Sequence, residues 1–153
     1  MENNETIDVL NTLVEINNDR IEGYVTASSE TDDHELKTLF AKLAQTSNKC
    51  KNELVSEIIK LGGQPTESTK TTGKFFRVWM DVKTAITGKN RKAILDLCEF
   101  GEDQALKTYE KALKDDIEHL NTPLQMLITS QYASITADHH TIKTMRDELV
   151  TTS

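Results

Sequence analysis

The sequence predicts an all-α protein that folds as a four-helix bundle. Four long segments carry apolar residues at spacings of three and four, the period of an amphipathic helix. No segment shows the alternation of a β-strand, and only 6 of the 153 residues are Gly and 2 are Pro, which suits long helices. A chain of this length makes one compact domain, so we expect residues 1–153 to form a single unit.

The first helix is expected from about Glu5 to Ser29. Its apolar residues are spaced by threes and fours, at Ile7, Leu10, Val14, Ile21 and Tyr24. A polar break follows, in which Thr31 or Asp32 is expected to cap the next helix.

The second helix is expected to run from this break to the pair Gly62 and Gly63, because glycine commonly ends helices. Its apolar stripe comprises Leu36, Leu39, Leu43, Cys50, Leu54, Ile58 and Leu61. The break before it is short, so the first two helices should lie antiparallel.

Residues 64–73 form a loop by composition, and a short amphipathic helix is expected after them. One face of this helix carries Phe75, Val78, Trp79, Val82 and Ile86. Basic residues surround it between Lys70 and Lys92, so the segment is interpreted either as a helix packed on the bundle or as an anion-binding patch. Phe76 points off the main face and is a candidate contact for another subunit.

The third helix is expected from about Asn90 to Lys114, with Gly101 permitting a close approach between helices. Its stripe comprises Ile94, Leu97, Cys98, Gly101, Ala105, Tyr109 and Ala112. The fourth helix is expected to begin at Thr122 and Pro123, a cap followed by a proline in the first turn. Its stripe comprises Leu124, Leu127, Ile128, Ile135, Ile142, Met145 and Leu149.

The connection between the second and third helices is long. At about 3.3 Å per extended residue and about 1.5 Å per helical residue, it can return along a helix of roughly 40 Å. The third helix should therefore start at the end where the second one starts, which is the ferritin-like order with one long crossover. An up-down-up-down bundle with one oversized loop is the competing topology.

The charge of the chain limits its partners. Its 18 Lys and Arg against 25 Asp and Glu give a formal net charge of -7, which disfavours nucleic acid and anionic membranes as main partners. No apolar run approaches the roughly 20 residues that span a bilayer. The acidic N-terminus differs from the basic start of a signal peptide, so we expect a cytoplasmic protein.

Polar residues interrupt the apolar stripes near the middle of every long helix. A lone buried carboxylate costs several kcal/mol, so Glu102 should be paired, protonated or turned to solvent. If it is paired, Arg20 or His139 would neutralise it. The sequence therefore predicts a polar layer that fixes the register of the helices, made of Asn17, Arg20, Ser47, Glu102, Gln131 and His139.

A metal site is the alternative interpretation of the same region. Glu102, Asp138 and His139 are carboxylate and imidazole groups of the kind that bind iron or manganese. A di-iron bundle, however, needs Glu-x-x-His on each of two helices, and this motif does not occur in the sequence. We therefore expect no cofactor and no catalytic residues, with this metal set as the alternative.

Cys50 and Cys98 lie on apolar stripes without the spacing of a redox or zinc motif. We interpret both as small buried apolar residues.

Several stretches of the sequence are distinctive: residues 18–24 (NDRIEGY), residues 61–65 (LGGQP), Trp79, the pair Gly101 and Glu102, and residues 109–113 (YEKAL). In order and spacing they resemble domain-of-unknown-function family 2383, a bacterial family of ferritin-like four-helix bundles. The resemblance covers roughly Thr6 to Val150 and implies a ferritin-like bundle without an established reaction.

The pattern favours a structural or interaction protein that associates with itself or with another protein. The reason for this interpretation is that the sequence contains all four helices of a bundle but no complete set of catalytic or metal-binding residues. Two alternatives stay open: an iron-handling protein or oxidase that uses the metal set, and a stress-related scaffold that binds an anionic surface through residues 70–92.

Overall fold

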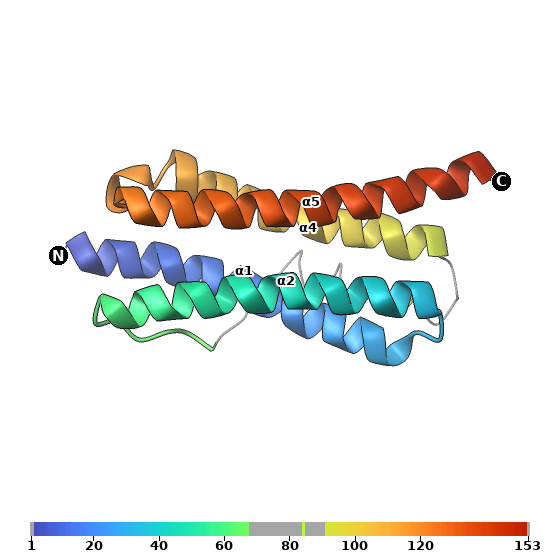
Figure 1. The fold of residues 1–153 in the computed structure, drawn as a ribbon, viewed down its shortest axis with the longest axis horizontal. Coiled ribbons are helices and arrows are strands. Elements are labelled where there is room, and N and C mark those ends of the chain that lie inside the picture. The colour runs from blue at the N-terminus through green and yellow to red at the C-terminus, as the bar shows by residue number, and fades with distance from the viewer. Residues whose placement is uncertain (1, 68–83, 85–90, 153) are drawn as a thin grey trace.

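The structure is a computed structural model that describes residues 2–67, 84 and 91–152. It contains four long helices, α1 (Glu2–Glu30), α2 (His34–Lys60), α4 (Arg91–Lys114) and α5 (Thr122–Thr152), and a short 3-10 helix, η1 (Ile117–His119) (Figure 1). No strand occurs among these described residues. The predicted all-α four-helix bundle is confirmed. The short helix expected around Trp79, and the basic residues between 70 and 90, lie outside the described part of the chain.

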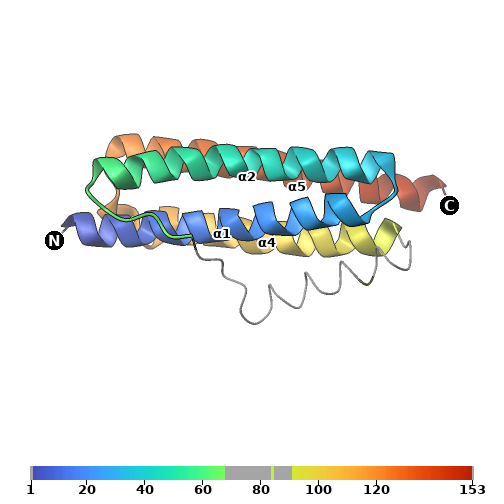
Figure 2. The ribbon, with the colours of Figure 1, turned by 90° about the horizontal axis from the view of Figure 1, so that it is seen from below.

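The helices form two antiparallel pairs, α1 with α2 and α4 with α5, which lie against each other (Figures 1 and 2). Arg91, the first residue of α4, forms ion pairs with Asp33 and Glu35 at the start of α2. At the other end of the bundle, Thr6 in α1 donates a hydrogen bond to the carbonyl of His119. Helices α2 and α4 therefore run in the same direction, which is the expected order of helix directions. The up-down-up-down alternative is wrong.

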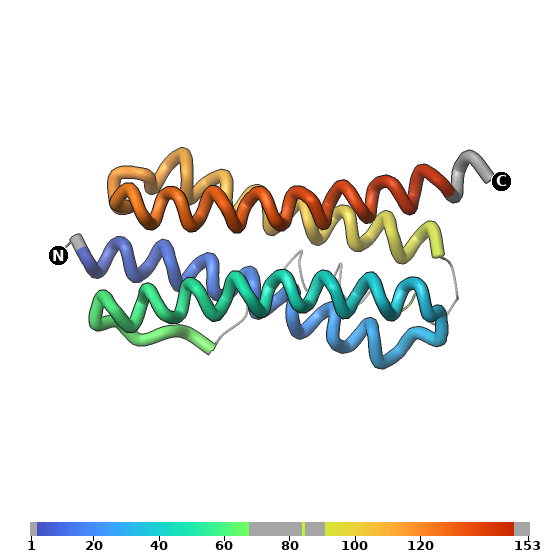
Figure 3. Tube along the Cα trace, viewed as in Figure 1, coloured from blue at the N-terminus to red at the C-terminus, as the bar shows by residue number. Residues whose placement is uncertain are grey.

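This order of directions places the two chain termini at opposite ends of the bundle, as Figure 1 shows. The end that holds the start of α1 also holds the end of α2, η1 and the start of α5 (Figure 3). We call it the η1 end. The opposite end holds the turn between α1 and α2 and the start of α4.

The caps of α2 and α5 differ from the expected residues. Asp33, not Thr31 or Asp32, caps α2: its Oδ1 accepts hydrogen bonds from the backbone N–H groups of Glu35 and Leu36, at 3.0 and 3.2 Å. The side chain of Asn121 accepts in the same way from the N–H of Leu124, at 3.0 Å, so α5 is capped one residue before Thr122. Both caps are short side chains with an oxygen that reaches the unpaired N–H groups of the first turn.

Helix α2 ends at the expected glycine pair. Gly62 has φ 80°, a left-handed conformation that glycine adopts without strain. The next residue, Gly63, donates its N–H to the carbonyl of Ile58 at 2.9 Å and passes close to α1. A Cβ at Gly63 would lie 2.8 Å from Cδ1 of Ile7, which explains why a residue without a side chain is needed there.

The core consists of two apolar clusters along the bundle. The first includes Leu10, Leu13 and Ile128 and lies toward the η1 end, whereas the second includes Phe40, Leu43 and Leu95. Cys50 and Cys98 are buried free thiols. Burial raises the pKa of Cys50 to about 11 and that of Cys98 further, so both stay protonated at neutral pH.

We predict that Gly63→Ala destabilises the protein by about 1–3 kcal/mol, because the new methyl group overlaps Ile7 and forces a local shift. Gly101→Ala is the matched control. A Cβ at Gly101 meets no atom within 4 Å, contrary to the close helix approach expected there. The control should leave stability unchanged or raise it by up to about 1 kcal/mol through better helix propensity. Urea unfolding followed by circular dichroism measures both, and equal effects of the two changes would contradict the close contact.

Candidate functional site

The centre of the bundle is organised around the buried guanidinium of Arg20 on α1. Its Nη2 lies 2.6 Å from Oε1 of Glu102 on α4 and 3.4 Å from Oδ2 of Asp138 on α5. Its Nη1 donates to Oγ of Ser47 on α2 at 2.5 Å. One side chain therefore connects all four helices. We call Arg20, Ser47, Glu102 and Asp138 the Arg20 cluster.

Helical spacing explains why Arg20 points inward. It follows Leu13 and Asn17 by seven and three residues, so it continues the buried face of α1. Tyr24, one turn further along, places its ring 5.7 Å from the guanidinium carbon. An aromatic face at this distance attracts a cation, so Tyr24 adds a contact that hydrogen bonds alone do not supply.

A second chain of polar groups crosses the bundle one to two helical turns from the Arg20 cluster. Asn17 Nδ2 donates to the Tyr109 hydroxyl at 2.8 Å, and this hydroxyl donates to Oε1 of Gln131 at 2.8 Å. Gln131 Nε2 then donates to the carbonyl of Cys50 and to Oε1 of Glu53, at 3.1 and 3.2 Å. This chain, like the cluster, has members on all four helices.

The Arg20 cluster contains more acidic groups than basic groups, because two carboxylates face one guanidinium. Burial raises the pKa of Glu102 above its ordinary value of 4.5, and the attraction of Arg20 only partly offsets this rise. Burial alone lowers the pKa of Arg20, but Glu102, Tyr24 and Asp138 together raise it above its ordinary range. Arg20 therefore stays charged at every pH at which the protein is folded.

The structure brings five of the six predicted layer residues into these two connected networks: Asn17, Arg20, Ser47, Glu102 and Gln131. His139 does not share their contacts. Its Nε2 lies 2.8 Å from Asp103 and 3.7 Å from Glu99, in a partly exposed position between α4 and α5. Neighbouring residues on a helix point about 100° apart, so Asp138 and His139 cannot both face Arg20. Arg20 and His139 are the two candidates for neutralising Glu102, and the structure places Arg20 beside it.

Tyr109 is the member of these networks that the sequence analysis missed. It was assigned only to the apolar stripe of its helix, although its hydroxyl joins Asn17 to Gln131. The spacing of residues along the helix indicates this position for the Tyr109 side chain. Tyr109 follows Glu102 by seven residues, two helical turns, so its hydroxyl had to enter the same polar region.

The convergence of Glu102 and Asp138 does not fit a metal site. The guanidinium of Arg20 lies between these carboxylates and occupies the place of a cation. The third proposed ligand, His139, is turned toward Asp103. Within residues 2–67, 84 and 91–152, no three His, Cys, Asp or Glu side chains are grouped as metal ligands.

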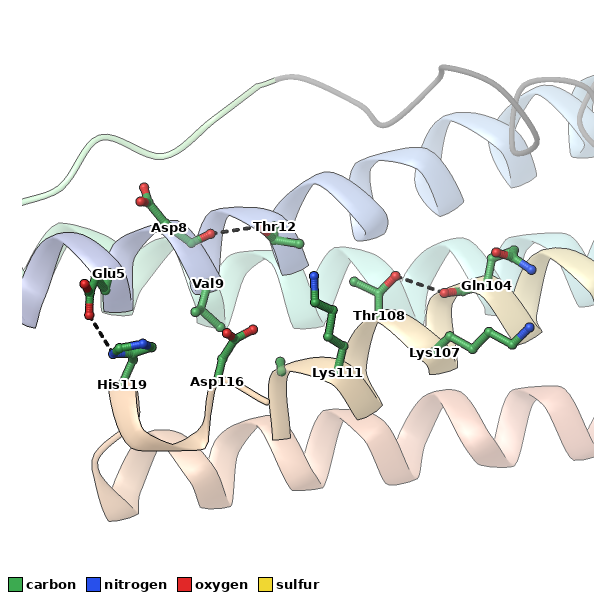
Figure 4. A pocket seen from close by; sticks show the side chains of 11 residues that line it. Glu5, Asp8, Val9, Thr12, Gln104, Lys107, Thr108, Lys111, Asp116 and His119 are labelled. Carbon is green, nitrogen blue, oxygen red and sulfur yellow. Dashed lines mark hydrogen bonds and ion pairs between the residues drawn. The ribbon is translucent and has the colours of Figure 1, made fainter. Parts of the chain in front are cut away.

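A surface groove of about 560 Å³ lies between α1, α4 and η1 (Figure 4). Val9 and Ala112 contribute apolar side chains to its lining, while Lys111 and Asp116 contribute opposite charges. An ion pair of 2.8 Å between Glu5 and His119 lies at one end. None of its lining residues belongs to the Arg20 cluster. The groove and the buried polar groups are therefore separate features.

Comparison with known families shows the family to which the chain belongs. Residues 5–115 match the model of the family described as "Domain of unknown function (DUF2383)". The chain belongs to this family. The match covers α1, α2 and α4, and hence Arg20, Ser47 and Glu102, whereas α5 with Asp138 lies beyond it. The resemblance was expected to extend to about Val150, so the matched region is shorter.

No curated protein matches the chain. Among the described helices, none combines the length and apolar character that crossing a bilayer requires.

We predict that Arg20→Met destabilises the protein by about 3–5 kcal/mol, because it leaves two buried carboxylates without their cation. The double variant Arg20→Met/Glu102→Leu should regain part of this loss, since it replaces one of the two carboxylates by an apolar group but leaves Asp138 without its cation. Lys60→Met, which removes an exposed pair with Glu57, is the control and should change stability by less than about 1 kcal/mol. Urea unfolding measures all three, and an Arg20→Met protein as stable as wild type would refute the assignment.

The pKa of Glu102 gives a prediction about pH. Because this pKa is raised in the folded state, folding binds a proton that the unfolded chain releases above about pH 4.5. The stabilising contribution is complete below that pH and is lost as the pH rises through the folded pKa. Relative to Glu102→Gln, which does not titrate, the wild type should therefore lose stability between pH 4 and 8. Urea unfolding of both proteins across this range tests the sign, and a rising difference would contradict it.

Proposed function

We propose that this protein is a non-enzymatic four-helix bundle of the ferritin-like kind, which acts in the cytoplasm by associating with a second copy or with another protein. The observation that carries this proposal is the mutual pairing of the central polar groups. Arg20, Ser47, Glu102 and Asp138 bind one another inside the bundle. Groups paired in this way hold helices in register and are not available to a substrate.

The outer surface supports the association. Several large apolar side chains are exposed, namely Val25, Ile59, Phe100, Ile117 and Met126. Three of these, Ile59, Ile117 and Met126, lie near the η1 end, on the last turn of α2, on η1 and on the second turn of α5. The hydrogen bond between Gln131 and Glu53 sets the register of α2 and α5, and it places Met126 level with Ile59. Burying such residues against another chain is favourable by about 25 cal/mol per Å² of apolar area.

Ferritin-like kinship is supported by the directions of the helices, in which α2 and α4 run the same way. An iron-handling or oxidase function is less well supported, because Arg20 binds both candidate carboxylates and His139 faces Asp103.

We predict that the protein sediments as an oligomer, or is recovered with a protein partner, and that Ile59→Lys/Met126→Lys weakens this association at least tenfold. The reason is that two charges would have to be buried in the contact surface. Val25→Lys is the matched control, since it places a lysine at an exposed apolar position on α1. Analytical ultracentrifugation and affinity capture measure the effect. A strictly monomeric wild type that captures no partner would refute the proposal.

A further inference from the structure

The head group of Arg20 is held in the way that a protein holds a bound ligand. Two carboxylates, a hydroxyl and an aromatic face surround it, from Glu102, Asp138, Ser47 and Tyr24. Three of these four side chains belong to helices other than that of Arg20. The surrounding groups therefore converge on the guanidinium because the bundle folds, and not because they are its neighbours in the sequence.

We infer that the centre of the bundle is a binding site for a guanidinium-type cation, and that the side chain of Arg20 is its resident ligand. An Arg20→Ala chain, which keeps only Cβ, should therefore take up a free alkylguanidinium from solution. Ethylguanidinium reproduces the atoms that this substitution removes, from Cγ to the two terminal nitrogens. This inference does not depend on what the outer surface of the bundle binds.

The contacts explain why the site selects this class of cation. A guanidinium is planar and presents several N–H donors, so one group can donate to Glu102, Asp138 and Ser47 while its face lies near Tyr24. Two carboxylates without a cation are costly in a buried place, which favours uptake of a positive ligand over a neutral one.

The test is thermal unfolding of the full-length Arg20→Ala protein at neutral pH, with and without ethylguanidinium, together with calorimetric titration. The unfolding temperature of Arg20→Ala should rise by about 5 °C once the ligand occupies the folded protein. At higher ligand concentrations it should rise further, with the logarithm of the concentration. At about 20 mM the denaturing action of a guanidinium salt is negligible, since it lowers the unfolding temperature by less than about 1 °C. The wild type should show no rise, because Arg20 already fills the site.

Matched ligands test the chemical class. Ethylurea has a similar shape without the charge, and ethylammonium has the charge without the planar fork, so each should stabilise Arg20→Ala less than ethylguanidinium does. Equal stabilisation by either compound, or greater stabilisation by Mn²⁺, would overturn the inference. So would a folded Arg20→Ala protein that does not respond to ethylguanidinium.

Two further measurements keep the test decisive if Arg20→Ala does not fold alone. Its dilution from urea into buffer with ethylguanidinium should restore the helical signal, and failure to do so would contradict the proposal. The double variant Arg20→Ala/Glu102→Leu lacks one of the two carboxylates, so it should lose at least nine-tenths of the affinity. An unchanged response of this variant would show that the ligand binds elsewhere.

Discussion

The arrangement of the bundle depends on one buried positive charge. Arg20 is almost completely buried, and each of the other three long helices supplies a polar side chain to its guanidinium. A charge in this position is tolerated only while these partners stay in place, because an unpaired buried charge costs several kcal/mol. A shift of any helix by one turn would move its partner by about 5.4 Å and break the contact. The cluster therefore fixes the register of the helices in a way that apolar contacts alone do not.

The two apolar clusters and the polar networks between them have different roles. Leucine, isoleucine and valine side chains supply most of the favourable free energy through their burial. Such side chains pack with little directional preference, so several registers would bury similar areas. The hydrogen bonds of Asn17, Tyr109 and Gln131 have defined donors and acceptors, and they exclude those other registers. Stability and specificity thus come from different residues of one core.

The fold could be predicted almost completely from the sequence, because helical period, glycine stops and connection length are local properties. The caps were misplaced by one or two residues, since Thr31, Asp32 and Asp33 all have suitable side chains and only the backbone path decides among them. The composition of the site could be predicted only in part, because the sequence pattern assigns Asp138 to the metal alternative and Tyr24 and Tyr109 to apolar stripes. The pairing of its side chains could not be predicted. Arg20 and His139 were equal candidates for Glu102, and the choice depended on how α4 and α5 are rotated against each other. That rotation is a tertiary property.

The positions of the chain ends have a practical consequence. The N-terminus emerges at the same end of the bundle as Ile59, Ile117 and Met126, whereas the C-terminus emerges at the opposite end (Figure 1). A bulky tag fused before α1 would crowd those apolar side chains, while the same tag fused after α5 would leave them open. Joining the start of α1 to the end of α5 in a circularly permuted chain would need a linker that spans the whole length of the bundle. Attachment chemistry for imaging or immobilisation should therefore use the C-terminus.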